Sequence, residues 1–206
     1  MSTLVRIPSD VAFTPAVKAI QARKGSRGAY ARMEQGGGWH TEIDADLAAF
    51  LGEQTSVFLG TASAAGQPYI QHRGGPKGFL RVLDPRTIAF ADYRGNRQYI
   101  SSGNLAENPR VILFLIDYLH QSRVKIWGEA RVVEDDPALL ASLMPEGYAA
   151  RPEQALVLRV TAWDANCPQH IPRRVEAEEV ETMLAERDEK IARLTAELRA
   201  LREVKG

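Results

Sequence analysis

The spacing of apolar residues changes twice along the chain, and each change predicts a different kind of structure. Up to about residue 55 the apolar positions recur with helical spacing, from there to residue 163 they alternate as in strands, and from residue 176 they follow a heptad. A first helix is predicted where Thr14 provides an N-cap, Pro15 suits the first turn and Gly25 ends the segment. The following stretch, residues 25–39, is rich in Gly and Arg and is expected to be irregular.

A second helix is expected to begin near Thr41, because Thr41 and Asp44 have the spacing of a capping box. Its apolar face consists of Ile43, Leu47, Phe50 and Leu51. Two further helices are predicted later in the chain, near residues 95–107 and 137–144.

Seven extended segments dominate the middle of the chain. They are residues 57–63, 69–73, 79–83, 87–92, 111–117, 123–133 and 155–163. Ala65-Gly66 and Asp84-Pro85-Arg86 are good turn sequences between consecutive strands. Because few helices separate the strands, the order favours an antiparallel barrel or sandwich over a doubly wound α/β fold. We therefore predict a mainly β (α+β) protein, with the barrel favoured.

The last part of the chain is rich in Glu, Arg, Ala and Leu and predicts a long helix. Its seam has a strict 4-3-4-3 spacing, broken once by an arginine: Val180, Leu184, Arg187, Ile191, Leu194, Leu198 and Leu201. A dimeric coiled coil is slightly favoured over an amphipathic helix that lies on its own barrel. The chain is thus expected to comprise an N-terminal extension (1–40), a barrel (41–174) and a C-terminal heptad helix (175–206).

Composition and charge narrow the function classes. Lys plus Arg equals Asp plus Glu, 26 against 26, so the long-range field that attracts nucleic acid or an anionic membrane is missing. The longest apolar run, residues 111–116, is too short to span a membrane. Cys167 is the one cysteine, which excludes an intrachain disulfide and suits a reducing compartment. With no secretory signal visible, a cytoplasmic protein is expected.

Common catalytic and metal motifs are not recognisable. There is no GxGxxG, the Gly74–Gly78 segment lacks the order of a P-loop, and the four histidines form no HExxH. Cys167 and His170 have CxxH spacing, but the other ligands of a closed zinc site are not evident. We expect no metal, and Cys167 to be a small buried residue.

Basic residues gather around a glycine-rich segment and a predicted helix start. The cluster contains Arg73, Lys77, Arg81, Arg94 and Arg97. Free N–H groups at a helix start beside a guanidinium form a site for a phosphate, and Asn96 could cap that helix, with Ser101 and Ser102 as further donors. On spacing alone, a solvated strand edge beside a capped helix is favoured over a phosphate site.

Several sequence blocks in order resemble the pyridoxamine 5'-phosphate oxidase-like FMN-binding family. They are PYIQHRGGPKGFLRVLD, TIAFADYRGNRQYISSGNLAENPRVILFLID and RVKIWGEARVV, with FTPAVKAIQARKGSR and NCPQHIPRR shared with its related flavoproteins. The resemblance covers about residues 10–174. It implies a split barrel that holds FMN at the interface of a homodimer.

The resemblance also implies site residues. Gly78, Phe79, Leu80 and Arg81 match the strand that borders the flavin and meets the phosphate, close to Arg73 in the basic cluster. Asp92, Tyr93, Asn96, Arg97 and Ser101 match the turn and helix start that hold the ribityl phosphate, and Asn104 matches a helix residue of the same motif. Arg123 matches a strand position that reaches the isoalloxazine edge, often from the partner subunit. A cation there would stabilise the anionic reduced flavin.

The chain also departs from the oxidase pattern. Ser101 stands where a basic residue is expected, and the Arg-and-His substrate segment near the C-terminus is not recognisable. We therefore expect an FMN-dependent oxidoreductase that acts on a small molecule without the vitamer-oxidase activity. The alternatives are a non-enzymatic flavin- or haem-binding sensor or carrier and a purely structural dimer. No catalytic residue is assigned, although His72 and Tyr93 lie where they could move protons.

Overall fold

The structure is a computed structural model that describes residues 7–166 and 168–203. Cys167, expected to be buried, lies outside the described residues. The described chain divides into two compact units. The first unit comprises residues 7–117 and 123–166, and the second comprises residues 118–122 and 168–203.

The N-terminal part of the first unit is more helical than predicted. A short 3-10 helix η1 (Pro8–Val11) precedes α1 (Pro15–Lys24), in which the Thr14 side chain accepts a hydrogen bond from the Val17 N–H and Gly25 ends the helix with a φ of 82°. The expectation of an irregular segment after Gly25 is wrong, because α2 (Arg27–Gln35) follows at once.

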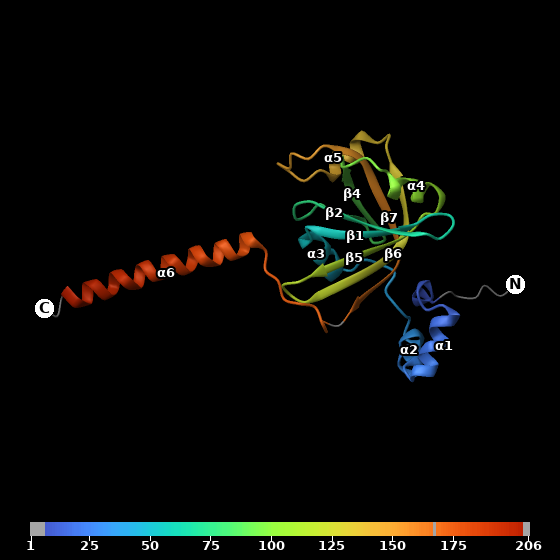
Figure 1. Cartoon of the computed structure of the whole chain (residues 1–206), viewed down its shortest axis with the longest axis horizontal. Helices are drawn as coiled ribbons and strands as arrows, with labels where there is room; N and C mark the ends of the chain where they lie inside the picture. Colours follow the sequence, from blue (N-terminus) through green and yellow to red (C-terminus); the bar gives the residue numbers. More distant parts are fainter. Residues whose placement is uncertain (1–6, 167, 204–206) are drawn as a thin grey trace. The chain divides into compact units, whose positions relative to one another are not determined.

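Ion pairs stabilise α2 and join it to α1. The buried Glu34 carboxylate pairs with Arg27 on its own helix and with Lys18 of α1, the latter at 3.2 Å. Figure 1 shows α1 and α2 side by side. Helix α3 (Ala45–Glu53) begins one turn later than expected, because Asp44 rather than Thr41 caps it by accepting a hydrogen bond from the Leu47 N–H at 2.8 Å.

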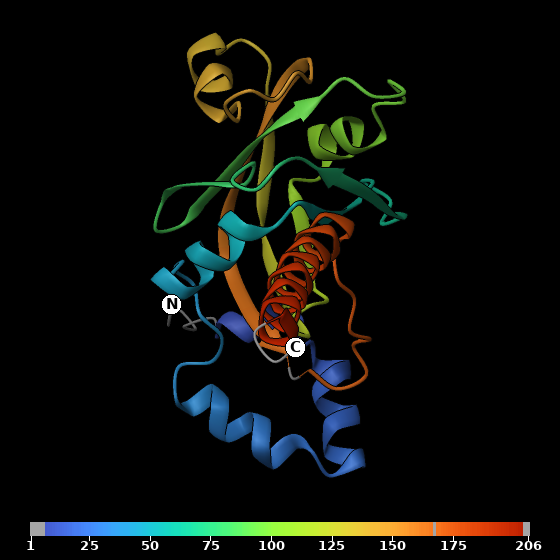
Figure 2. The same cartoon turned by 90° about the vertical axis from the view of Figure 1, so that its left-hand side faces the viewer.

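All seven predicted strands form, in one seven-stranded antiparallel sheet that matches a split-barrel fold (Figures 1 and 2). They are β1 (Ser56–Ala62), β2 (Pro68–Gly74), β3 (Arg81–Asp84), β4 (Thr87–Tyr93), β5 (Arg110–Asp117), β6 (Ser122–Val133) and β7 (Pro152–Asn166). Their order in the sheet is β2-β1-β5-β6-β7-β4-β3. Both predicted turns lie between strands, and the Asp84 carboxylate accepts from the Arg86 N–H at 2.7 Å in the second.

The core lies inside this barrel and under α3. Alternate positions of β6 are buried, as predicted, with Val124, Ile126 and Ala130 on the inner face. Phe79 and Leu80 are buried too, but they precede β3 instead of belonging to it. Gly78, with a φ of 81°, turns the chain before β3, and its N–H donates to the Gly52 carbonyl at 2.7 Å.

Two helices interrupt the strand series. Helix α5 (Pro137–Leu143) lies where it was predicted and packs on β4 and β7. Helix α4 is shorter than predicted, Ile100–Glu107, and Asn96 does not cap it. The Asn96 amide oxygen instead accepts a hydrogen bond from the Gln98 N–H at 3.3 Å, inside the loop that precedes α4.

The second unit contains the long C-terminal helix α6 (Ala177–Glu203), confirmed as a helix. Its seam residues are exposed, from Val180 at 40% to Leu201 at 60%. Within this unit the Arg174 guanidinium lies 4.5 Å from the ring centroid of Tyr118. Among the described residues, no helix has the length and apolar character needed to cross a membrane.

Candidate functional site

A pocket of about 210 Å³ lies where β2, β4, the loop before α4 and the start of β7 meet. We call it the Arg97 pocket. Six of the predicted site residues line it: Arg73, Asp92, Tyr93, Asn96, Arg97 and Ser101. The fold therefore brings Arg73 of β2 together with Arg97 of the loop that follows β4, whereas Lys77 and Arg81 of the same basic cluster do not line this pocket.

A polar network joins the strands beneath the Arg97 pocket. The Arg73 Nε lies 2.7 Å from the Asp92 Oδ1, and both side chains are largely buried, at 15% and 14% exposure. This contact is an ion pair without an aligned hydrogen bond, so the Arg73 Nε–H is not satisfied. The Gln154 amide donates to the other Asp92 oxygen at 2.8 Å and lies 3.1 Å from the Ser102 hydroxyl. Asp92 is thereby fixed as the partner of Arg73.

The loop before α4 has an unusual backbone. Arg97 and Tyr99 both have positive φ, at 60° and 53°, a conformation that non-glycine residues rarely adopt and that often marks ligand-binding loops. The Arg97 Nε–H donates to the Tyr99 hydroxyl at 2.9 Å, and that hydroxyl donates to the Glu153 carboxylate at 2.7 Å. These bonds hold the Arg97 guanidinium at the pocket while leaving it 54% exposed.

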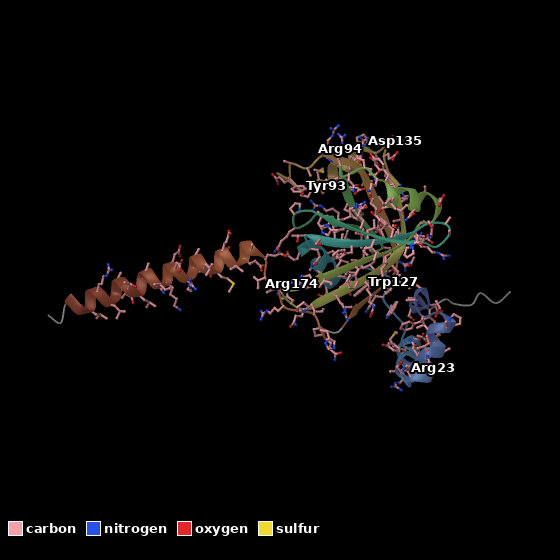
Figure 3. The ribbon with its side chains drawn as sticks, viewed as in Figure 1. Arg23, Tyr93, Arg94, Trp127, Asp135 and Arg174 are labelled. Atoms are coloured by element: carbon pink, nitrogen blue, oxygen red, sulfur yellow. The ribbon has the colours of Figure 1, made fainter. Side chains whose placement is uncertain are left out.

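Tyr93 contributes an unused donor. Its hydroxyl is buried without a hydrogen-bond partner among the described residues. Burial raises the pKa of the Tyr93 phenol, and the nearby Tyr148 adds to the shift, so the group is a neutral donor near neutral pH. Figure 3 shows Tyr93 and Arg94 at the same end of the barrel. A buried hydroxyl without a partner costs free energy, which a ligand oxygen in this pocket would recover.

A hollow of about 300 Å³ adjoins the Arg97 pocket and adds positive charge. Arg94 and Arg151 line it together with Arg97 and Glu153. The Arg94 N–H donates to the Arg151 carbonyl at 2.9 Å, which places the two arginines on neighbouring strand ends. Three guanidinium groups against one carboxylate make this corner favourable for an anion.

The other predicted site residues do not line the Arg97 pocket. Phe79 and Leu80 belong to the core, Gly78 precedes them in the loop, and Arg81 is exposed on β3. The Asn104 amide donates to the Thr61 hydroxyl at 2.9 Å, a structural bond between α4 and β1. Arg123 lies at the start of β6. Contact of these residues with a cofactor stays a prediction.

Sequence reasoning missed the acceptors of the pocket. Gln71, Tyr99 and Glu153 line it but were not among the assigned residues, whereas Ser102 was expected as a hydroxyl donor. Glu153 and Gln154 lie more than fifty positions from the basic cluster, so local spacing gave no signal. Gln71 and Arg73 are two positions apart on β2, so both lie on the same, half-buried face of the strand. This alternation could have identified Gln71 together with Arg73. His72 also lines the pocket, and its Nε2 lies 2.7 Å from the Ser56 hydroxyl.

The family model described as Pyridoxamine 5'-phosphate oxidase matches residues 43–167. The chain belongs to this family. No curated protein matches the sequence. The pyridoxamine 5'-phosphate oxidase family binds flavins, includes flavin-dependent oxidoreductases and is often dimeric. The Arg97 pocket therefore lies within the matched segment of a flavin-binding family.

Solved structures with similar folds share little sequence with this member of the pyridoxamine 5'-phosphate oxidase family. HupZ of Group A Streptococcus is 17% identical to this chain, and the match covers 65% of this chain and 100% of the HupZ chain with a TM-score of 0.48. A Clostridium acetobutylicum protein related to general stress protein 26 is 15% identical, covering 62% and 89%, with a TM-score of 0.42. The FAD binding protein of Mycobacterium smegmatis is 18% identical, covering 62% and 97%, with a TM-score of 0.41.

Proposed function

We propose that this protein is an FMN-binding oxidoreductase that acts on a small molecule, with the ribityl phosphate of FMN in the Arg97 pocket. The observation that carries the proposal is the donor set of that pocket. Arg73, Arg97 and Tyr93 line the pocket together with Ser101 and Ser102 in the first turn of α4, and the Tyr93 hydroxyl has no hydrogen-bond partner among the described residues. Charge-assisted donors of this kind fit a phosphate.

The chain's residues would divide the work of holding the cofactor. Arg97 would pair with the phosphate, and its bond to Tyr99 would orient the guanidinium before binding. Ser101 and Ser102, in the first turn of α4, would donate hydroxyl hydrogen bonds. Asp92 would keep Arg73 in place. When bound, the flavin ring would supply hydride or electron transfer, and the protein would orient the substrate against it.

The proposed assembly is a homodimer with FMN at the subunit interface. Arg123 lies on β6 outside the Arg97 pocket of its own chain, which fits a residue that acts on the partner's flavin. A guanidinium near the isoalloxazine edge would stabilise the anionic reduced ring. We retain the division into an N-terminal extension, a barrel and a heptad helix, with FMN held by the barrel. The single cysteine suits a reducing compartment, so we propose a cytoplasmic location.

Pyridoxamine 5'-phosphate oxidase activity itself is not proposed. Ser101 offers no positive charge where the oxidase pattern has a basic residue. A non-enzymatic sensor or carrier that binds flavin or haem is the alternative.

The absorption spectrum of the purified protein separates the two cofactors. Flavin bands, with FMN released on denaturation, support the proposal, whereas a Soret band would support haem. Titration with FMN and with riboflavin then tests the site, because riboflavin lacks the phosphate. We expect riboflavin to bind at least about tenfold more weakly, since it forgoes charge-assisted hydrogen bonds. Equal affinities would leave flavin binding intact but refute the phosphate assignment.

A further inference from the structure

A second hollow lies at the other end of the barrel and is lined by aromatic rings. Its volume is about 580 Å³, and all three tryptophans of the chain, Trp39, Trp127 and Trp163, line it with Phe13 and Tyr30. We call it the tryptophan hollow. Figure 3 shows Trp127 far from Tyr93 of the Arg97 pocket. A volume in this range is typical of sites for small organic molecules.

The rings of the tryptophan hollow support one another. Trp39 and Trp127 are stacked, with centroids 4.7 Å apart and an interplanar angle of 12°. Phe13 lies 5.0 Å from Trp39, and Tyr30 lies 5.1 Å from Phe13. The Trp163 ring is held by a 2.8 Å hydrogen bond from its Nε1–H to the Glu42 carbonyl. The walls are therefore ordered before any ligand binds, which lowers the entropic cost of binding.

The fixed charges of the tryptophan hollow cancel. The Lys125 ammonium lies 3.4 Å from an Asp164 carboxylate oxygen and lies above the Trp39 and Trp127 rings, 5.7 and 5.5 Å from their centroids. The hollow thus offers aromatic side chains but no uncompensated charge from this pair. Because the Lys125 ammonium already lies over two of the rings, an uncharged ring is a better match for these walls than a second cation.

Most of this hollow lies outside the segment that matches the family. Eight of its thirteen lining residues precede residue 43, where the match begins. The short segment between η1 and α1, the helices α1 and α2 and the loop after α2 supply these eight residues, and β6 and β7 supply the rest. The N-terminal extension therefore builds one side of the hollow onto the barrel.

We infer that the tryptophan hollow is a binding site for a planar, uncharged heteroaromatic molecule. The inference rests on the aromatic walls, the volume and the cancelled charges, and it does not depend on FMN binding elsewhere. Stacking against the rings would provide the affinity, and the exposed His40 imidazole at the hollow would provide a polar contact.

Quinoline is a suitable probe because it is planar, heteroaromatic and uncharged at mildly alkaline pH. We expect calorimetric titration of the purified full chain to give one saturable site per chain, with parallel quenching of tryptophan fluorescence. Because every tryptophan lines the hollow, the fluorescence reports on this site directly. N-methylquinolinium and quinoline-2-carboxylate should bind more weakly. Absence of saturable binding, or preference for a charged analogue, would overturn the inference.

A matched pair of variants places the site. Tyr30 lines the hollow and is 41% exposed, whereas Tyr148 is 40% exposed and lies outside its lining. Tyr30→Leu should weaken quinoline binding about three- to tenfold, and Tyr148→Leu should not change it. Trp39→Leu, a loop variant, is a second test if Tyr30→Leu fails to fold. The site would be refuted if Tyr30→Leu and Tyr148→Leu changed quinoline affinity equally. It would also be refuted if quinoline bound only after a dimer of this protein had dissociated.

The exposed seam of α6 carries a second inference on independent grounds. Its residues follow the a and d positions of a heptad, with Leu184, Ile191 and Leu198 at a and Arg187 at a d position. In a parallel pair, Arg187 would face the partner's Arg187, and two positive charges would meet in the seam. In an antiparallel pair, a faces d, and Arg187 would face the partner's Leu198.

The flanking charges favour the antiparallel arrangement as well. In that register Ile191 faces the partner's Leu194, and Lys190 lies beside the partner's Glu197, twice by symmetry. The parallel register pairs Lys190 with the partner's Thr195 instead. We propose that α6 pairs with α6 of a second copy in the antiparallel sense.

Disulfide trapping distinguishes the orientations in the full chain, with Cys167→Ser to remove the natural thiol. In the antiparallel pair Leu184 faces the partner's Leu201. Leu184→Cys and Leu201→Cys should therefore crosslink when the two variants are mixed, and neither should crosslink alone. Crosslinking of Leu184→Cys alone would show a parallel pair. No crosslink in any sample would show that α6 does not pair, and either result overturns the proposal.

Discussion

The Arg97 pocket and the tryptophan hollow belong to one unit but differ in what they leave unsatisfied. In the Arg97 pocket the Tyr93 hydroxyl is buried without a partner among the described residues, and Arg73 faces Asp92 without an aligned hydrogen bond. In the tryptophan hollow the charges of Lys125 and Asp164 pair, and aromatic side chains form much of the lining. Unused donors indicate an anion site, whereas an aromatic lining beside cancelled charges indicates a site for an uncharged ring.

The largest expected effect is that of removing Arg97. Arg97→Ala should weaken FMN binding about ten- to hundredfold, because a hydrogen bond to a charged group is worth about 1.5–3 kcal/mol. Quinoline binding in the tryptophan hollow should not change. Fluorescence titration with FMN and calorimetry with quinoline measure the two sites separately.

Arg86→Ala is the matched control for Arg97→Ala. Arg86 is 46% exposed, close to the 54% of Arg97, and also pairs with a glutamate, Glu42, but it lies outside the Arg97 pocket. It should leave FMN affinity unchanged. If the Arg97→Ala variant binds FMN as tightly as the Arg86→Ala variant does, Arg97 does not bind the FMN phosphate. The Arg97 pocket would then not be the anion site of this comparison.

The next effect concerns the ion pairs that join α1 to α2. Glu34→Gln should lower the hydrogen-exchange protection of α2 about tenfold, since it removes charge-assisted bonds from Arg27 and Lys18. Quinoline binding should weaken with it, because Tyr30 and Met33 lie on α2 and line the tryptophan hollow. FMN binding should be unaffected. Unchanged protection of α2 in Glu34→Gln would count against this link.

The same ion pairs predict a pH dependence. The hydrogen bond from Arg27 is the main reason why the pKa of Glu34 lies below its ordinary value of 4.5. A lowered folded pKa contributes stability that is present above the unfolded value and is lost as pH falls through the folded value. Acidification below about pH 4.5 should therefore lower the hydrogen-exchange protection of α2 in the wild type more than in Glu34→Gln.

Tyr93→Phe should have a smaller effect on the Arg97 pocket. Loss of one neutral hydrogen bond should weaken FMN binding about two- to tenfold, and stability without FMN should not fall, because the hydroxyl has no partner among the described residues. The pKa of Tyr93 is raised above its ordinary value of 10.0, so the effect should be constant from neutral pH up to that value. A loss of stability in the FMN-free variant would contradict this interpretation.

The sequence predicted the barrel better than the extensions, for physical reasons. Strand alternation and turn residues act locally, so all seven strands were found within a few residues of their bounds. Helix α2 was missed because its stability comes from Glu34, whose partner Lys18 lies on α1. The start of α4 was misplaced because Gly95 and Asn96 are typical of a cap, whereas the chain continues through left-handed Arg97 and Tyr99 before the helix begins.

Only part of the candidate site could be predicted, because some of its residues are close in sequence and others are brought together by strand pairing. Basic residues and serines near the glycine-rich segment pointed to the Arg97 pocket, because they are close in sequence. Their partners on β7, Glu153 and Gln154, come into place through the pairing of β4 with β7, in which Asp92 faces Gln154. Such cross-strand neighbours depend on sheet register, which a single sequence does not encode locally.

The smallest expected effect is that of removing α6. Truncation after Arg174 should leave FMN affinity unchanged, because no residue of α6 lines the Arg97 pocket. The dimer should also survive, since the proposed flavin interface lies in the barrel. Loss of the antiparallel α6 pairing should nevertheless make the truncated dimer dissociate at a somewhat higher protein concentration. Sedimentation across a dilution series measures this. A truncated chain that is monomeric at every concentration would place the assembly in α6 and remove the argument for a flavin shared between barrels.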